Sequence, residues 1–166
     1  MSDFFVAESG IRQLHARCVD AVWRKDAKAF ADCFTEDGEW HIARLQFRGR
    51  AAVKKAFAEF LGQFDRALMT FRTPCLEVKG GTAAGRTYVT EQSRYTNGRS
   101  VNSIGIYYER FVEQGGSWRF SWRHFQLHYV GPPDLSGQFF ENPEYGPPPG
   151  MPALDAPTDD YTGLGN

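Results

Sequence analysis

Two long β-rich runs meet at Asn97-Gly98, and this feature constrains the fold more than any other in the sequence. A two-residue type I′ turn needs positive φ at both central positions, which Asn-Gly accepts well. The flanking runs, 83–96 and 99–113, are then antiparallel neighbours that are long for a globular domain. Because each strand adds right-handed twist, such a hairpin curves around whatever it packs against. The sequence therefore predicts a curved sheet.

Helical periodicity in the first half of the chain predicts a layer of helices beside the curved sheet. Apolar residues recur at helical spacing after Ser9, which predicts a helix over 9–24. Asp26 can cap a second, short helix, and the same spacing predicts a third over 50–65. A strand is expected over 39–47, between the second helix and the third. These helices are expected to pack inside the curved sheet.

Regular β structure is predicted to fill the rest of the domain from residue 70 onward. Turn signals divide this part into four consecutive strands, at Gly80-Gly81, Asn97-Gly98 and Gly115-Gly116. The expected fold class is α+β, with a curved mixed or antiparallel sheet around three N-terminal helices.

Composition changes after Val130 and divides the chain into two parts. Eight of the nine prolines lie in the last 36 residues. We therefore predict one domain over 1–130 and an extended, Pro-rich arm over 131–166 without regular structure. Apolar residues in this arm favour packing on its own domain or on a neighbouring subunit over a free tail.

Charge, cysteine content and missing motifs argue against several functions. With 19 Lys and Arg against 20 Asp and Glu, no nucleic-acid or anionic membrane surface is expected. Three cysteines without CxxC spacing argue against a disulfide framework, and together with the absence of a leader they favour the cytoplasm. No nucleotide-binding motif is present. The 15% aromatic content is typical of cores and apolar ligand pockets.

The order of elements and several short motifs resemble the SnoaL-like branch of the NTF2-like superfamily over about 9–130. The motifs are Ile11-x-x-Leu14, Trp23-x-Lys25-Asp26-x-x-x-Phe30, Phe34-Thr35-Glu36-Asp37-Gly38-x-Trp40, Gly49 and Gly116-x-Trp118-Arg119-Phe120. The resemblance implies a cone-shaped fold with a deep apolar pocket between sheet and helices. It also implies cofactor-independent chemistry like that of scytalone dehydratase, ketosteroid isomerase, dehydrochlorinases or aromatic lyases. Other relatives are non-catalytic small subunits of ring-hydroxylating dioxygenases.

The dehydratases of this family pair an Asp on the first helix with a His before the second strand, and this chain departs from that pattern. Trp23 stands at the Asp position, and Met69 or Thr70 stands at the His position. Other residues would have to move protons here.

Positions that face the pocket in relatives supply the alternative candidates. Glu91 is our candidate base, because burial raises the pKa of a carboxyl group toward neutrality. Arg123 could hold a phenolate, enolate or carboxylate, and Tyr107 could donate a hydrogen bond to developing charge. Each also has a structural interpretation: Glu91 could pair with Arg94 or Arg110 on a solvated face, Arg123 could lie at a surface or subunit interface, and Tyr107 could be a buried core residue.

Four histidines complete the titratable candidates. His41 and Arg44 have opposite parity on the first strand, so one of the two is expected to face the pocket unless a bulge intervenes. His124 and His128 lie about 13 Å apart at roughly 3.3 Å per residue, too far to share a metal ion, so no metal is expected. Both are expected on the outer face of the sheet, whereas His15 belongs to the first helix.

We predict that catalysis depends on Glu91, Arg123, Tyr107 and His41. The predicted substrate-binding residues are His15, Trp23, Arg44, Met69, Arg72, Val89, Phe125 and Leu127. The expected activity is cofactor-independent dehydration, elimination, carbon–carbon cleavage such as deformylation, or isomerisation. The expected substrate is a hydrophobic aromatic or phenolic molecule, reacting through a quinone-methide-like intermediate. A dioxygenase small subunit and a ligand-binding module are the alternatives, and a homodimer or homotrimer is expected.

Overall fold

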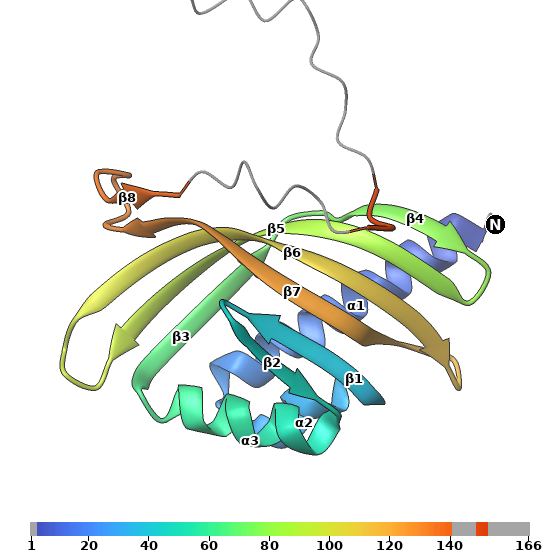
Figure 1. Cartoon of the computed structure of the whole chain (residues 1–166), viewed down its shortest axis with the longest axis horizontal. Helices are drawn as coiled ribbons and strands as arrows, with labels where there is room; N and C mark the ends of the chain where they lie inside the picture. The colour runs from blue at the N-terminus through green and yellow to red at the C-terminus, as the bar shows by residue number, and fades with distance from the viewer. Residues whose placement is uncertain (1–2, 141–148, 153–166) are drawn as a thin grey trace, which may run out of the picture.

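Three helices lie against one face of a strongly curved sheet in the computed structural model, which describes residues 3–140 and 149–152 (Figure 1). The helices are α1 (Asp3–Trp23), α2 (Ala27–Asp32) and α3 (Arg50–Leu61). The strands are β1 (Phe34–Ile42), β2 (Leu45–Arg48), β3 (Phe64–Phe71), β4 (Cys75–Lys79), β5 (Thr82–Tyr95), β6 (Ser100–Gln114), β7 (Ser117–Gly131) and β8 (Gln138–Phe139). No described helix is long and apolar enough to cross a membrane.

The sheet is mixed and open, with the strand order β2-β1-β7-β6-β5-β3. β4 pairs with β5, and β8 pairs with β7. The only parallel pairing among the described strands joins β1 to β7, and it connects the N-terminal half of the chain to the last long strand. β5 and β6 pair in register from Thr82 opposite Val112 to Arg94 opposite Ser100, which is the long hairpin that Asn97-Gly98 predicts. The turn itself is not the predicted type I′ form, because Gly98 has a positive φ of 84° and Asn97 does not, and the Tyr95 amide donates a hydrogen bond to the Arg99 carbonyl oxygen across residues 96–98. The predicted α+β class with a curved mixed sheet is confirmed.

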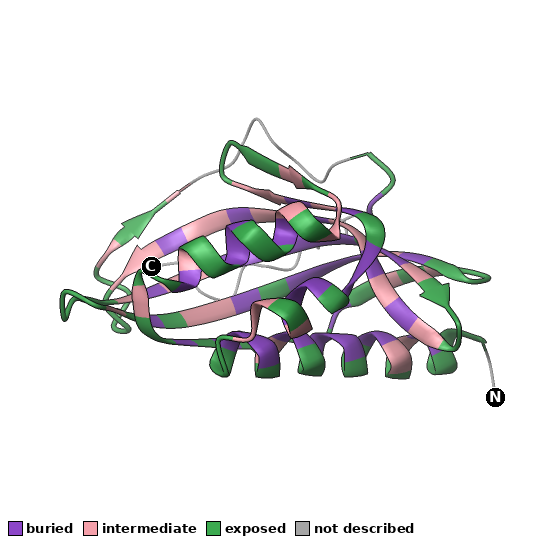
Figure 2. Ribbon diagram, turned by 90° about the horizontal axis from the view of Figure 1, so that it is seen from below, coloured by how far each residue is buried: buried purple, intermediate pink, exposed green. Residues whose placement is uncertain are grey.

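The hydrophobic core lies between the concave face of the sheet and the helices. Figure 2 shows buried residues along both the helices and the strands of these two layers. α1 contributes an apolar stripe that includes Ile11, Leu14 and Cys18, all fully buried. The rings of Phe30 and Phe57 stack with their centroids 3.7 Å apart and hold α2 against α3. Such close aromatic packing fixes the helices at one end of the sheet.

Helix ends differ from the sequence prediction for physical reasons. Asp26 caps α2 as predicted, and its side chain accepts a hydrogen bond from the Ala29 amide at 2.9 Å. α1 begins at Asp3 rather than at Ser9, because its first residues are exposed and leave no apolar periodicity to detect. α3 ends at Leu61 rather than at residue 65, and the chain continues as edge strand β3, which the prediction missed.

The predicted strand over 39–47 is a two-stranded hairpin. β1 begins at Phe34, before the predicted start of the strand at residue 39, and ends at Ile42. Ala43 then adopts a positive φ of 52°, which reverses the chain into β2. An alanine in this conformation gives no sequence signal for a turn, because the favoured residues are Gly, Asn and Asp.

The outer, convex face of the sheet is partly covered by the chain itself. Met151 packs against Ile106 and Tyr108, and Arg110 donates a hydrogen bond to the carbonyl oxygen of Pro149 at 2.9 Å. The short strand β8 corrects the expectation that nothing regular follows Val130. Most of the predicted arm, 141–148 and 153–166, lies outside the described residues, so the arm as a whole stays a prediction.

Candidate functional site

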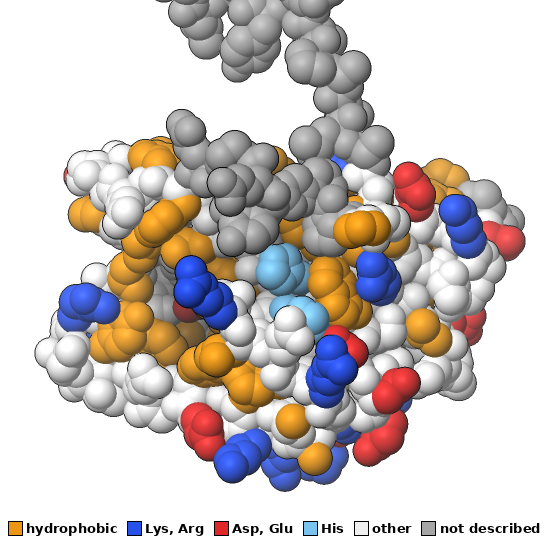
Figure 3. All heavy atoms as spheres, in the orientation of Figure 1, with side chains coloured by type: hydrophobic (Ala, Val, Ile, Leu, Met, Phe, Trp, Pro, Cys, Tyr) orange, Lys and Arg blue, Asp and Glu red, His pale blue; other side chains and the backbone are white. Residues whose placement is uncertain are grey.

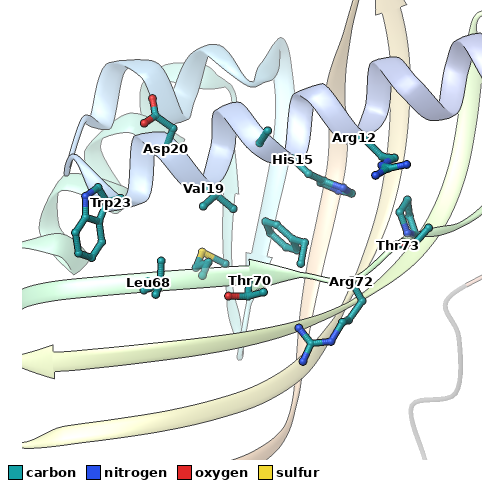
Figure 4. A pocket seen from close by; sticks show the side chains of 13 residues that line it. Arg12, His15, Val19, Asp20, Trp23, Leu68, Thr70, Arg72 and Thr73 are labelled. Carbon is teal, nitrogen blue, oxygen red and sulfur yellow. The ribbon is translucent and has the colours of Figure 1, made fainter.

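An open cleft of about 760 Å³ separates α1 from the edge strand β3. Its described lining consists of Arg12, His15, Ala16, Val19, Asp20, Trp23 and residues 68–74. Figure 4 shows that the cleft runs from Trp23 toward Arg12 and Thr73. A cleft of this size with mostly apolar walls and a few polar groups is typical of a small-molecule site.

Charged side chains mark the rim of this outer cleft. Arg12 and Arg72 lie toward the end near Thr73 and bring positive charge to it. Asp20 instead directs its carboxylate away from β3 and accepts a hydrogen bond from Arg24 Nε at 2.9 Å (Figure 4). The cleft is therefore better suited to an aromatic ligand with a negative group than to a cation.

His15 brings titratable chemistry to the wall of the outer cleft. Only 5% of the residue is exposed, and its ring stacks on Phe71 with centroids 4.8 Å apart. His15 Nε2 lies 2.9 Å from Glu109 Oε2. The other ring nitrogen, Nδ1, makes no hydrogen bond with any described residue, so it is the nitrogen left for a ligand. An imidazole oriented by a carboxylate in this way can act as a general base.

Glu109 lies on the inner face of β6 and collects three hydrogen bonds in the core. Thr87 Oγ1 donates to Oε2 and Arg123 Nε donates to Oε1, both at 2.9 Å, in addition to the contact with His15. Burial alone would raise the pKa of Glu109, but the charges of His15 and Arg123 and these hydrogen bonds lower it below its usual range. Glu109 is therefore an ionised partner that holds the His15 ring in place.

Arg123 is the positive partner of this cluster and is fully buried. Its guanidinium carbon lies 3.8 Å from the ring centroid of Tyr107 and 4.1 Å from that of Phe120. Nη1 donates to Cys18 Sγ at 3.4 Å, whereas Nη2 has no hydrogen-bond partner among the described residues. Guanidinium groups tolerate such burial because they stack on aromatic faces and stay charged.

Cys18 adds a second ionisable group beside Arg123. A hydrogen bond from Cys33 lowers the pKa of Cys18 to about 7, against the effect of burial, and the charge of Arg123 contributes to the same lowering. Cys33 shows the reverse, and its pKa is raised. The core behind His15 is thus polar and hydrogen-bonded, although it lies inside an aromatic shell.

A second, inner cavity of about 130 Å³ lies deeper, between α3 and the concave face of the sheet. Its described lining consists of Val22, Phe30, Trp40, Ile42, Phe57, Phe60, Leu61, Phe64, Ala67, Met69, Glu91 and Tyr107. Met69 also lines the outer cleft, and it is the one described residue common to both. Met69 therefore forms the partition between the two spaces.

Glu91 and Tyr107 are the titratable groups of the inner cavity. Burial raises the pKa of Glu91, and a hydrogen bond from Ser93 Oγ to Glu91 Oε1, at 2.7 Å, opposes the rise. Burial also raises the pKa of Tyr107, so its hydroxyl stays protonated. A carboxyl group whose pKa is raised in an apolar cavity can exchange protons nearer to neutral pH.

The structure brings the predicted site residues together in two groups. His15, Trp23, Met69 and Arg72 line the outer cleft, and Glu91, Tyr107 and Met69 line the inner cavity. The other predicted residues line neither space, and they are Arg123, His41, Arg44, Val89, Phe125 and Leu127.

Three of those remaining residues belong to the core. Val89 is buried, Phe125 packs against Tyr107 with ring centroids 5.0 Å apart, and Arg123 lies in the Glu109 cluster. Leu127 is half-buried further along β7.

His41 and Arg44 are both directed away from the two cavities. His41 contacts Trp122 and His124 on the outer face, with ring centroids 5.4 and 6.2 Å away. Arg44 is exposed, because β1 ends at Ile42 and the chain turns before alternation can direct Arg44 inward. Figure 3 shows histidine side chains among hydrophobic ones near the middle of this outer face.

Glu109 is the functional candidate that sequence reasoning missed. It lies two residues after Tyr107 on the same strand, so alternation alone directs it to the same face as Tyr107. Alternation could therefore have identified Glu109 from the sequence. The sequence could not show that Glu109 pairs with His15, because the two residues are 94 positions apart in the chain.

Comparison with known proteins identifies the family of the chain. Residues 6–124 match the family model of the SnoaL-like domain, so the chain belongs to the SnoaL-like family. A search of the curated proteins finds no match.

Solved structures give the same fold. A Mycobacterium tuberculosis protein of unknown function is 25% identical, with a TM-score of 0.70 over 76% of this chain and 75% of the other. A protein assigned as a scytalone dehydratase of Novosphingobium aromaticivorans is 23% identical, with a TM-score of 0.73 over 76% and 87% of the two chains. LinA is 21% identical, with a TM-score of 0.72 over 85% and 97%. At these identities the likeness establishes the fold.

Proposed function

We propose that the chain is a cofactor-independent lyase or isomerase that acts on a hydrophobic aromatic small molecule. The observation that carries the proposal is the His15 and Glu109 pair at the wall of the outer cleft, with Nε2 to Oε2 at 2.9 Å. The names of structurally similar proteins, a scytalone dehydratase and a hexachlorocyclohexane dehydrochlorinase, support an elimination. Both reactions need a base in an apolar cleft.

His15 is the proposed base. Glu109 holds Nε2, so Nδ1 accepts a proton from a ligand in the cleft. Ionised Glu109 then stabilises the imidazolium that forms, and Arg123 keeps Glu109 ionised through its hydrogen bond at 2.9 Å. In this proposal His15 on α1 and Glu109 on β6 take the place of the Asp and His dyad of the family's dehydratases.

The proposed substrate is a phenolic molecule that carries a leaving group on the carbon attached to its ring. Its ring would lie along Val19, Trp23 and Leu68, which are apolar lining residues of the outer cleft. Arg12 and Arg72 would attract the developing phenolate electrostatically. Trp23 is 51% exposed, so it offers a ring face to stack on without unfolding the core.

The proposed reaction balances without a redox partner. The phenol O–H bond breaks and its proton moves to His15 Nδ1. The phenolate electrons form the quinone methide as the bond to the leaving group breaks, and the leaving group takes that electron pair. Protonated His15 returns its proton to the leaving group, so the sum is loss of a neutral molecule HX.

The test compares wild type with His15→Gln on 4-hydroxybenzyl compounds that carry hydroxyl or halide leaving groups, with products followed by mass spectrometry. Removing a general base lowers turnover by about 10²–10⁴-fold. His124→Gln is the matched control on the outer face and keeps wild-type turnover. Equal rates for wild type and His15→Gln would overturn the assignment of the base.

Native mass spectrometry of protein from its own host separates this proposal from the two alternatives. A homo-oligomer that retains an aromatic ligand and turns it over supports the enzyme. A stoichiometric large partner subunit supports a dioxygenase small subunit. A retained ligand that persists unchanged through long incubation supports a binding module.

A further inference from the structure

A separate pocket of about 240 Å³ lies at the end of the sheet that carries β8 and the hairpin between β5 and β6 (Figure 1). Arg66 of β3, Arg94 of β5 and Asn102 of β6 line it, together with Pro132 and Pro133, which follow β7. We call this space the end pocket. Its described lining includes two arginines and no acidic residue, so its character is basic.

The register of the sheet sets the two arginines side by side. Arg66 and Arg94 are directly opposite each other in the pairing of β3 with β5. Like charges in directly opposite positions share a face of the sheet, repel each other and reduce stability. Among the described residues, the one ion pair of either arginine joins Arg94 Nε to Asp65 Oδ2 at 3.8 Å, and Arg66 Nη1 donates to the Asp65 carbonyl oxygen at 2.9 Å. One carboxylate therefore serves two guanidinium groups, and the pair keeps a net positive charge.

Alternation places Asn102 on the same face as the arginines. Ser100 is directly opposite Arg94, and Asn102 follows Ser100 by two residues on β6. The same alternation continues to Ile106, which packs against Met151 on the outer face. The end pocket therefore opens on the face of the sheet opposite to the helices.

The side-chain amide of Asn102 lacks a partner at this pocket. Asn102 is 6% exposed, and its side chain makes no hydrogen bond with any described residue. A nearly buried amide that stays unpaired costs free energy, and it can donate two hydrogen bonds. The pocket thus combines a neutral donor with the two charged ones.

The wall of the end pocket is held in place by a buried tyrosine. Tyr129 is 1% exposed, and its hydroxyl donates a hydrogen bond to the Pro132 carbonyl oxygen. The same hydroxyl accepts a hydrogen bond from the Gly137 amide at 2.9 Å. Proline also fixes its own φ, so the segment is rigid at Pro132 and Pro133. A wall that is already ordered lowers the entropic cost of binding.

Size and charge together define the ligand that suits this pocket. An apolar cavity of about 150 Å³ in another protein holds one benzene molecule, so about 240 Å³ has room for a small organic molecule rather than a bare inorganic ion. Val101 and the two prolines offer apolar contacts to an organic chain. Two guanidinium groups with Asp65 beside them carry about one net positive charge, which matches a monoanion better than a dianion. Guanidinium groups bind carboxylates through paired hydrogen bonds.

We infer that the end pocket is a binding site for the carboxylate of a small aliphatic acid. Arg66 and Arg94 hold the two carboxylate oxygens, and the Asn102 side chain donates a hydrogen bond to one of them. The aliphatic chain lies along the Pro132-Pro133 wall. The site is on the other face of the sheet from the His15 and Glu109 pair, so the inference does not depend on the proposed function.

Butyrate tests the site in an NMR titration of the ¹⁵N-labelled wild-type protein at constant ionic strength. The probe signals are those of the Asn102 side-chain amide, identified by their loss in Asn102→Leu. We expect these signals to shift and to saturate with butyrate. Butyramide has nearly the same shape without the charge, and we expect it to bind at least tenfold more weakly. Signals that do not shift with butyrate, or equal affinities for butyrate and butyramide, would overturn the inference.

Arginine variants assign the binding to the end pocket. Arg94→Gln removes one charged donor and should weaken butyrate binding by about tenfold or more. Arg99→Gln makes the same change at an exposed residue of the adjacent hairpin outside the pocket lining, and should keep the affinity within about twofold. Should Arg94→Gln fail to fold, Arg66→Gln removes the opposite partner and should have the same effect.

Two further results would contradict the site as stated. An affinity for butyrate that falls in Arg72→Gln but not in Arg94→Gln would place the carboxylate in the outer cleft. Tighter binding of inorganic phosphate than of butyrate at the Asn102 signals would overturn the assignment to a carboxylate.

Discussion

The two faces of the sheet carry similar sets of side chains in different surroundings. On the inner face His15 Nε2 lies 2.9 Å from Glu109 Oε2, and on the outer face His41 Nε2 lies 2.8 Å from Glu39 Oε2. The inner side chains are 6% and 0% exposed, against 15% and 30% for the outer ones. The distances are nearly equal, so distance alone does not identify a functional pair.

Each face also has an arginine over an aromatic ring. Arg123 lies 3.8 Å from the Tyr107 centroid and is fully buried, whereas Arg110 lies 4.7 Å from the Trp122 centroid and is exposed. Water screens the outer charges and weakens their interactions, while the inner charges depend on one another. A charged cluster therefore gains energetic weight when it is shielded from water.

The largest expected effect comes from removing the inner carboxylate. Glu109→Gln leaves Arg123 buried without a counter-charge, so the free energy of unfolding should fall by about 3–5 kcal/mol. Glu39→Gln, the same change on the outer face, should cost less than about 1 kcal/mol. Urea unfolding followed by circular dichroism measures both. Similar losses for the two variants would show that burial does not make the inner carboxylate more important for stability than the outer one.

A smaller effect is expected from filling space on the inner face. A Cβ at Gly105 would lie 2.4 Å from Phe125 Cε2 and 2.5 Å from the Gln126 carbonyl oxygen, so Gly105→Ala should destabilise by about 1–3 kcal/mol. At Gly81 the nearest atom, Glu113 Cβ, is 3.9 Å away, and Gly81→Ala should keep or slightly raise stability. The midpoints of thermal unfolding of the two variants measure this difference. An unchanged midpoint for Gly105→Ala would show that the side chains around Gly105 can move to admit a methyl group.

The inner face should also show a pH dependence set by Glu91. Because burial raises its pKa, the folded protein binds this proton more tightly than the unfolded chain does. Stability contributed by the protonated carboxyl is therefore lost as pH rises through the folded pKa. Glu91→Gln removes this loss, so the unfolding free energy of the variant minus that of wild type should increase from pH 4 to pH 7.

An exposed carboxylate controls for the change in net charge. Glu113→Gln, at an exposed position of β6, should give a difference from wild type that varies much less over the same pH range. A Glu91→Gln difference that stays constant with pH would show that Glu91 ionises in the folded protein as it does in water.

The smallest expected effect belongs to the outer arginine. Arg110→Met removes the contact with Trp122 and the hydrogen bond to Pro149, and should lower the free energy of unfolding by about 0.5–1 kcal/mol. Added salt should reduce the difference from wild type, because the charge is exposed. A loss as large as that of Glu109→Gln would show that the outer face is as strongly coupled as the inner one.

The parts of the fold set by local chemistry could be predicted from the sequence. Asn97-Gly98 marks the central hairpin because Gly98 accepts the positive φ of 84° that the turn requires, although Asn97 does not adopt the predicted type I′ conformation. Asp26 caps α2 because a carboxylate satisfies a free amide. Strand β3 was missed because Phe57, Phe60 and Phe64 also fit helical spacing, and only pairing of β3 with β5 makes Phe64 part of a strand.

The candidate site was predictable where it depends on alternation along one strand. Alternation, counted from positions that face the pocket in relatives, predicted Glu91 and Tyr107, and both line the inner cavity. It could not give the partition by Met69 or the pairing of His15 with Glu109, since both depend on how α1 packs across the sheet. Alternation also could not show that Arg44 lies beyond the end of β1, because the turn at Ala43 contains no glycine or asparagine that would predict a turn.

The 94 positions between His15 and Glu109 also set the order in which the protein can be made. A ribosome working at about 5–20 residues per second exposes the helix that carries His15 for roughly 5–20 s before Glu109 has been synthesised. The parallel pairing of β1 with β7 waits longer still, because β7 ends at Gly131. During that interval the apolar stripe of the nascent helix has no sheet to cover it. The contact between His15 and Glu109 therefore forms only after β6 has been synthesised and has packed across α1.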